Sequence, residues 1–347
     1  MTVARKSLVD VSLTRYYHCI SRCVRGAFLC GEGFEHRKQW IEDRLEVLAA
    51  QFAVSVCGFA VMDNHLHVLV RLDPKLSSDW SDEEIVRRWL AVYPPRTLNF
   101  DDAACVRMWI DNELKRPKQV AEYRRRLQDL GWFMKALKEP LSRLANKEDE
   151  CKGAFWEGRF KSIAILDEEA LLATCAYIDL NPVAAGIAAT PETSRHTSVR
   201  QRVQHAQEKG KLAAIKEAAR GSVAGSRAAG KFEESHWLCP VQDARTLGAS
   251  REGMLESFSL GSYLLLVDYT GRLFRQGKAR ISSEVAGILE RLGSSAEFWT
   301  DRLQQMRSKS RLFGNYFATA RDKLRAAAAH RGVHHVDNAV RLTVATS

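Results

Sequence analysis

The sequence predicts an α+β or α/β sandwich in the first part of the chain. Hydrophobic patterns follow the order strand, helix, hairpin, helix, strand and helix, and a chain with this order buries a sheet under helices. The 347 residues exceed one average domain. Because 46% of them are apolar and 27% are charged, the composition excludes a chain that is disordered throughout.

The first half of this pattern contains a strand, a helix and a hairpin. β-Branched and aromatic residues predict a strand over 16–22, and apolar residues at helical spacing predict an amphipathic helix over 34–52. Two apolar strands, 54–62 and 65–72, flank an Asp-Asn pair. This pair suits a two-residue turn because both side chains tolerate positive φ.

The second half is more irregular. A polar, locally basic and partly helical insertion is predicted over about 73–131. The helix predicted over 132–146 contains Pro140, which indicates a break or a kink. A strand is expected within 153–166, and the helix predicted over 167–180 begins with acidic residues that suit the helix dipole.

Composition changes after this first domain, which is predicted to span 1–190. Residues 191–240 predict a basic, flexible linker. A mainly helical, basic accessory region is predicted over 241–347, with a strand-like run near 262–272. Its last part predicts either a DNA contact or a helical cap or dimer contact, and the basic residues concerned are Lys309, Arg311, Arg321, Lys323, Arg325 and Arg331.

The overall charge bears on the class of partner. A formal net charge of +10 favours a polyanion, most simply a nucleic acid. No stretch reaches roughly 18 uncharged apolar residues, so no membrane span is expected. The N-terminus lacks the apolar segment of a secretory signal, which predicts a cytoplasmic location. Eight scattered cysteines predict reduced thiols, with a zinc site at Cys19 and Cys23 as an alternative.

Two histidines begin the second arm of the predicted hairpin. Alternate side chains of a strand share a face, so His65 and His67 point the same way. Two imidazoles on one face are half of a divalent metal site. The alternative is a pair of polar residues on a solvated strand face.

A tyrosine and an asparagine lie near the end of the last helix of this domain. Tyr177 and Asn181 are four residues apart and therefore share one helix face. A phenol can attack phosphorus when a metal polarises the phosphate, and an amide oxygen can complete the metal site. The alternative is a core tyrosine followed by an asparagine that ends the helix.

Together, the two motifs resemble a known family. GFAVMDNHLHVLV, followed downstream by FWEGRFKSIAILDEEALLATCAYIDLNPVAAG, resembles the IS200-like (Y1, HUH) transposases, nearest to the REP-associated tyrosine transposases, over about 10–190. The resemblance implies a ferredoxin-like or RRM-like antiparallel sheet. It also implies that His65, His67 and Asn181 bind Mg²⁺ or Mn²⁺ and that Tyr177 is the nucleophile. Other ligands could come from Asp167, Glu168 and Glu169.

The activity implied by the resemblance is cleavage and rejoining of single-stranded or hairpin DNA through a 5′-phosphotyrosine, by a monomer or a homodimer. DNA contacts are expected from Tyr17 and Arg22 on the first strand, and from Trp156, Arg159 and Lys161 before the last strand. Two alternatives remain open. One is a catalytically silent DNA-binding protein, and the other is a metal-dependent hydrolase or nuclease without a covalent step.

Overall fold

Four strands form one antiparallel sheet. The computed structural model describes residues 9–273, apart from 189, 220 and 257. The strands pair in the order β2-β3-β1-β4, and every pairing is antiparallel. Their bounds are Tyr16–Arg22 (β1), Val54–Val61 (β2), His65–Leu72 (β3) and Lys161–Ile165 (β4). An antiparallel sheet combined with helices confirms the α+β class.

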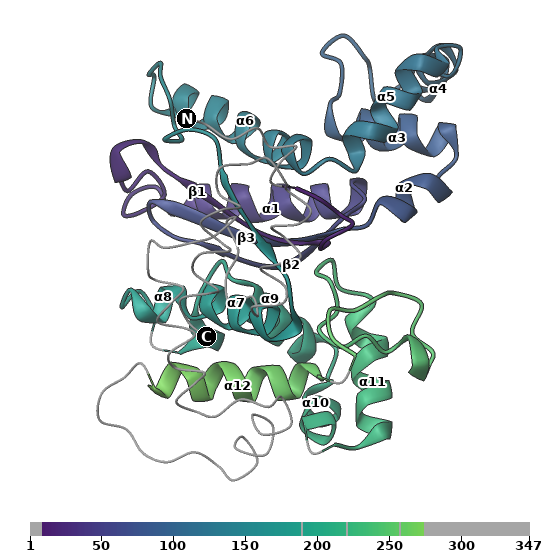
Figure 1. Ribbon diagram of the computed structural model, residues 1–347. Helices are drawn as coiled ribbons and strands as arrows, with labels where there is room; N and C mark the ends of the chain where they lie inside the picture. Colours follow the sequence, from purple (N-terminus) through teal and green to yellow (C-terminus); the bar gives the residue numbers. More distant parts are fainter. Residues whose placement is uncertain (1–8, 189, 220, 257, 274–347) are drawn as a thin grey trace, which may run out of the picture.

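Helices cover both faces of this sheet. Helices α1 (His36–Gln51) and α6 (Leu130–Glu148) lie over one face, and α7 (Glu168–Asp179) and α9 (Ser198–Glu208) lie over the other (Figure 1). Each face has its own hydrophobic core, and we call the core beneath α1 and α6 the first core and the core beneath α7 the second core. Two cores on one sheet require apolar residues on both faces of its strands.

Alternation along β1 assigns its side chains to the two faces. Tyr17 and Cys19 belong to the first core, whereas Tyr16 and Ile20 pack against the second. Strands β2 and β3 form the predicted hairpin, with the Asp-Asn pair between them. A register shift in β2 between Val56 and Gly58 resets the alternation there, which is the effect of a β-bulge.

The insertion is helical and lies beside α1 (Figure 1). Its helices are α2 (Pro74–Asp79), α3 (Asp82–Val92), α4 (Ala103–Leu114) and α5 (Pro117–Leu127). The side chain of Ser81 accepts a hydrogen bond from the backbone nitrogen of Glu84 at 3.2 Å and so caps α3. The three arginines of α5 are ion-paired: Arg124 with Asp82, and Arg125 and Arg126 with Glu122.

Of the break or kink expected at Pro140, the break is wrong, because α6 runs through this residue. Proline lacks the N–H that would bond the carbonyl of Ala136, four residues earlier. In this structure, Nε of Arg44 donates to that carbonyl at 3.1 Å, and its guanidinium also donates to the carbonyl of Val92 at 3.1 Å. The buried carbonyl therefore has a partner from α1, and the helix continues.

The flexible linker predicted over 191–240 is also wrong where the structure describes it. It contains α9, α10 (Leu212–Ala219) and α11 (Val223–Glu233), and side chains of all three helices belong to the second core. Two of its glycines allow close packing: a Cβ on Gly225 would lie 2.6 Å from the backbone nitrogen of Ala218, and a Cβ on Gly230 would lie 2.5 Å from Cβ of Ala244. A Gly- and Ala-rich composition can thus indicate tightly packed helices as well as a flexible chain.

The strand-like run near 262–272 is helical. Helix α12 (Leu260–Leu273) packs against α7 and α10, and an apolar run of this kind cannot be assigned to strand or helix by its pattern alone. The basic residues at 309–331 lie outside the described residues. Within the described part of the chain, no helix is long and apolar enough to cross a membrane. The remaining short elements are η2 (Val24–Gly26), α8 (Asn181–Ala184), η3 (Pro191–Thr193) and η4 (Arg245–Leu247).

A buried carboxyl group joins α7 to the elements that follow it. Asp179 accepts from Oγ of Ser198 at 2.6 Å, from the backbone nitrogen of Val199 at 2.9 Å, and from the hydroxyl of Tyr263. Burial raises the pKa of Asp179, and these three donors oppose the rise. The carboxyl group thereby anchors α9 and α12 to the end of α7.

Replacing Tyr263 with Phe is expected to lower the free energy of unfolding by about 1.5–3 kcal/mol, because the buried Asp179 loses one of its donors. Urea unfolding monitored by circular dichroism measures this loss. The matched control is Thr174→Val, which removes a 2.6 Å bond from a buried hydroxyl to the neutral carbonyl of Ala170 and should cost no more than about 1.5 kcal/mol. Equal losses in both variants would contradict the anchoring role.

Acid is expected to destabilise the fold through His236. Burial, with Arg202, His205 and Arg251 nearby, lowers the pKa of His236 to about 3, and its Nδ1 accepts from the backbone nitrogen of Leu238 at 3.2 Å. As the pH falls from about 6.5 towards 3, the unfolded chain binds a proton here that the folded chain does not, so stability is lost. Urea unfolding at pH 7, 6 and 5 measures how steeply the free energy of unfolding falls with pH. This fall should be less steep in His236→Gln than in the wild-type protein, by up to about 1.4 kcal/mol per pH unit. Identical slopes would refute this assignment.

Candidate active site

The paired histidines of β3, the tyrosine of α7 and the asparagine of α8 meet on the second-core face of the sheet. The ring centroids of His67 and Tyr177 are 5.6 Å apart, and those of His65 and His67 are 4.8 Å apart. Nδ2 of Asn181 lies 3.3 Å from Nε2 of His67. Tyr177 and Asn181 are half-buried, so the group is neither sealed in the core nor fully solvated.

The sheet register places two cations beside the histidines. Arg22 is opposite His65, and Ile20 is opposite both His67 and Lys161. Arg22 and Lys161 therefore share the face of the two histidines, and both side chains are exposed. A phosphate lying over His65 and His67 would be flanked by positive charge.

The local sequence of α7 explains where Tyr177 lies. The side chain of Asp167 accepts from the backbone nitrogen of Ala170 at 2.6 Å and caps the start of the helix. Tyr177 follows about three turns later, and Asn181 continues on the same side in α8. Tyr177 lies ten positions after Asp167, which is about 15 Å along the helix, so the acidic start of α7 does not supply ligands at this site.

Asn64 orients the first histidine. Its Nδ2 donates to the carbonyl of Gly26 at 3.2 Å, which leaves its Oδ1 to accept at 2.7 Å from Nδ1 of His65. The proton of His65 is therefore on Nδ1, and Nε2 keeps its lone pair. Burial, with Arg22 nearby, lowers the pKa of His65 to about 4, so the ring is neutral at pH 7.

His18 of β1 plays the equivalent part for the second histidine. Nε2 of His18 lies 2.9 Å from Nδ1 of His67, and both rings are buried. When Nδ1 of His67 donates to His18, its Nε2 accepts from Asn181. In this arrangement both histidines of β3 carry their proton on Nδ1 and have Nε2 available as a ligand atom.

The side chains gathered here include donors that a divalent cation can use. Among the residues that the structure describes, no group of three or more His, Cys, Asp or Glu side chains could hold a metal ion. The set here is two imidazoles and one amide. Rotating the Asn181 amide by 180° would bring Oδ1 to the place of Nδ2, 3.3 Å from Nε2 of His67. Adjacent ligands of an octahedral ion with bonds of about 2.1 Å are about 3 Å apart, so this spacing suits the pair.

The expected DNA contacts divide into two groups. Tyr17 is 1% exposed, lies on the opposite face of the sheet, and donates its hydroxyl to the backbone carbonyl of Asp10, so its assignment as a DNA contact is wrong. Trp156 is also largely buried, and its indole donates to the carbonyl of Lys138 at 3.3 Å. Arg22, Arg159 and Lys161 are all exposed.

The sequence did not predict that His18 and Asn64 belong to this site. His18 lies 47 positions before His65, and no spacing rule connects them; only the pairing of β1 with β3 does so. Asn64 was assigned a turn role only. Its position directly before His65 is the signal that could have pointed to it, since an amide in a turn can accept from the next side chain.

Comparison with known proteins found one similar solved structure. No family model matches this chain, and no curated protein matches it. A solved structure of the REP-associated tyrosine transposase bound to a REP hairpin is similar, with a TM-score of 0.32 and 13% sequence identity over 55% of this chain and 78% of that chain. The family of this chain is thus not established by comparison.

Proposed function

We propose that this protein is a metal-assisted tyrosine strand transferase that acts on single-stranded or hairpin DNA, with a ferredoxin-like sheet as its frame. The observation that carries the proposal is the convergence of His65, His67, Tyr177 and Asn181, which come from β3, α7 and α8. The arrangement combines a nucleophilic hydroxyl with a pair of imidazoles on one sheet face.

The chain's own residues account for the chemistry as follows. Oη of Tyr177 forms a bond to phosphorus, and the bond from phosphorus to the 3′ oxygen breaks. The phenolic proton is lost and the leaving oxygen takes up a proton, so that a 5′-phosphotyrosine and a free 3′-OH result. Attack of a 3′-OH on this linkage reverses the step and rejoins a strand. The phosphodiester energy is retained in the protein linkage, so no nucleotide hydrolysis is needed.

A bound Mg²⁺ or Mn²⁺, held by His65, His67 and Asn181, would supply charge stabilisation for the phosphate. Asn64 and His18 hold the two imidazoles in the tautomer that such a cation requires. The remaining phosphate charge faces Arg22 and Lys161 on the same sheet face.

The test is a denaturing gel of the protein after incubation with a panel of labelled single-stranded hairpin oligonucleotides, with Mn²⁺ or with EDTA. We expect a labelled band that resists SDS, requires Mn²⁺ and disappears after protease digestion. Cleavage without such a band would instead indicate a metal-dependent nuclease. Salt-sensitive binding without cleavage would indicate a catalytically silent DNA-binding protein.

A further inference from the structure

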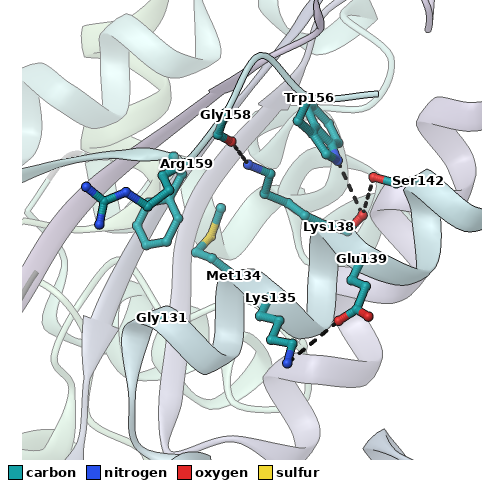
Figure 2. Close-up of a pocket in the computed structure, with 10 residues that line it drawn as sticks. Gly131, Met134, Lys135, Lys138, Glu139, Ser142, Trp156, Gly158 and Arg159 are labelled. Atoms are coloured by element: carbon teal, nitrogen blue, oxygen red, sulfur yellow. Dashed lines mark hydrogen bonds and ion pairs between the residues drawn. The ribbon is translucent and has the colours of Figure 1, made fainter. Parts of the chain in front are cut away.

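A cavity of about 270 Å³ lies between α6 and the loop that leads into β4 (Figure 2). Met134, Trp156 and Phe160 form apolar parts of its wall. Cationic side chains of Lys135, Lys138 and Arg159 also line it, together with Gly131, Glu139, Ser142 and Gly158. The cavity is large enough for one heterocyclic ring system but not for a helical peptide or a duplex.

The loop wall of this cavity is firmly held. Nζ of Lys138 donates to the carbonyl of Gly158 at 2.9 Å, and the indole of Trp156 donates to the carbonyl of Lys138 at 3.3 Å (Figure 2). Trp156 also forms an isolated β-bridge with Cys23, the residue after Arg22. The loop that lines the cavity is therefore bonded to α6 and lies beside the end of β1.

The cavity is also close to the candidate active site along the chain. Arg159 lines the cavity, and Lys161 begins β4 on the face of His67, so their Cα atoms are at most about 7 Å apart. Arg159 is exposed and forms no ion pair with any residue that the structure describes. A chain of phosphates that passes Arg22 and Lys161 can continue to Arg159.

The charges around the cavity favour an anionic ligand with an apolar part. Glu139 is the one acidic residue in its lining, and it is paired with Lys135 at 3.9 Å and with Arg143. Its negative charge is therefore balanced. An unpaired nucleotide has the matching chemistry, because its base is flat and largely apolar on both faces and its phosphates are anionic.

We infer that this cavity takes one unpaired nucleobase of the DNA substrate, in the single-stranded flank close to the phosphate at Tyr177, with an adjoining phosphate on Arg159. The inference rests on the proposed function for the identity of the substrate. It adds a recognition site on the α6 side of the sheet edge, separate from the histidines and the tyrosine.

An abasic scan tests the inference. A fluorescein-labelled hairpin oligonucleotide with single-stranded flanks carries one abasic site at a time, and its affinity for the Tyr177→Phe protein is measured by fluorescence anisotropy in EDTA. At one flank position, loss of the base should weaken binding about 5- to 100-fold, as for loss of a stacked base. Uniform affinity at every flank position would overturn the inference.

Two substitutions that fill the cavity test whether the base at the sensitive flank position binds there. Ser142→Phe fills the cavity, and among the described residues the Ser142 hydroxyl bonds only to a carbonyl of its own helix, so little else is lost. Gly158→Leu is the second filling variant, since a Cβ there meets no atom within 4 Å. Each should weaken binding of the intact oligonucleotide. In each variant, an abasic site at the sensitive position should then cause no further loss of affinity. If the abasic site still weakens binding in these variants, and the variants are folded, the base does not bind in the cavity.

The charge at the cavity is tested separately. Arg159→Gln should weaken binding severalfold, whereas Lys118→Gln, which removes an exposed cation of α5, should have a smaller effect. Equal effects would mean that Arg159 contributes only general charge. Covalent adduct formation by the wild-type protein distinguishes the two proposals: an adduct without a sensitive flank position would refute the cavity alone, and a sensitive position without an adduct would refute the strand-transfer reaction alone.

Discussion

The Tyr177→Phe protein is expected to form no covalent adduct with a hairpin oligonucleotide that the wild-type protein links to itself. The substitution removes the oxygen that would attack phosphorus and keeps the ring, which contacts His67 and His18 at centroid distances of 5.6 Å and 6.3 Å. DNA affinity should therefore change less than about twofold, because no charge is lost. The measurement pairs the SDS-resistant band with fluorescence anisotropy on the same oligonucleotide.

A second tyrosine of the same sheet face supplies the control. The hydroxyl of Tyr16 bonds to the carbonyl of Met254 at 3.3 Å, and Tyr16→Phe should keep the adduct. A persistent adduct in Tyr177→Phe would mean that another residue is the nucleophile. Loss of the adduct in both variants would instead point to a general disturbance of this face.

The second large effect is expected at His67. His67→Gln removes the imidazole that lies between His18 and Asn181, and with it the Nε2 that we propose as a ligand atom. Binding of Mn²⁺, measured by isothermal titration calorimetry without DNA, should fall below detection, and the adduct should be lost. His205→Gln, which alters a half-buried histidine of the α9–α11 region, should leave both unchanged.

The orienting role of Asn64 predicts a graded result in the same titration. Asn64→Ala removes the acceptor for Nδ1 of His65 and should weaken Mn²⁺ binding about 10- to 100-fold. Asn64→Asp keeps an acceptor oxygen there and should bind Mn²⁺ within severalfold of the wild-type protein. Unchanged binding in Asn64→Ala and in His67→Gln would exclude the site as a cation site.

The sequence was sufficient to predict the strands and helices whose hydrophobic residues recur with a strong period. The predicted strand over 16–22 has the bounds of β1, and the hairpin, the helix over 34–52 and the helix over 167–180 agree with β2, β3, α1 and α7 within a few residues. Local spacing also placed His65 beside His67, and Tyr177 on the side of Asn181, because these relations depend only on strand and helix geometry.

Contacts between segments that lie far apart in the sequence could be identified only from the tertiary structure. Pro140 stays within a helix because Arg44, from another helix, bonds the carbonyl that proline leaves free. The described residues of 191–240 form packed helices because Gly225 and Gly230 allow close approach and because Asp179 holds α9 to α7. Neither effect is visible in local composition, since both depend on partners far away in the chain.

The amino-acid sequence by itself determined which residue types could carry chemistry here: a pair of alternating histidines, a tyrosine and an asparagine one helical turn apart, and a basic overall charge. The tertiary structure decided which of them meet. The pairing of β1 with β3 brings His18 to His67, and alternation along β1 turns Tyr17 into the opposite core. The reason is physical: spacing along a strand or helix fixes local direction, whereas strand register and helix docking are set by the burial of apolar surface over the whole domain.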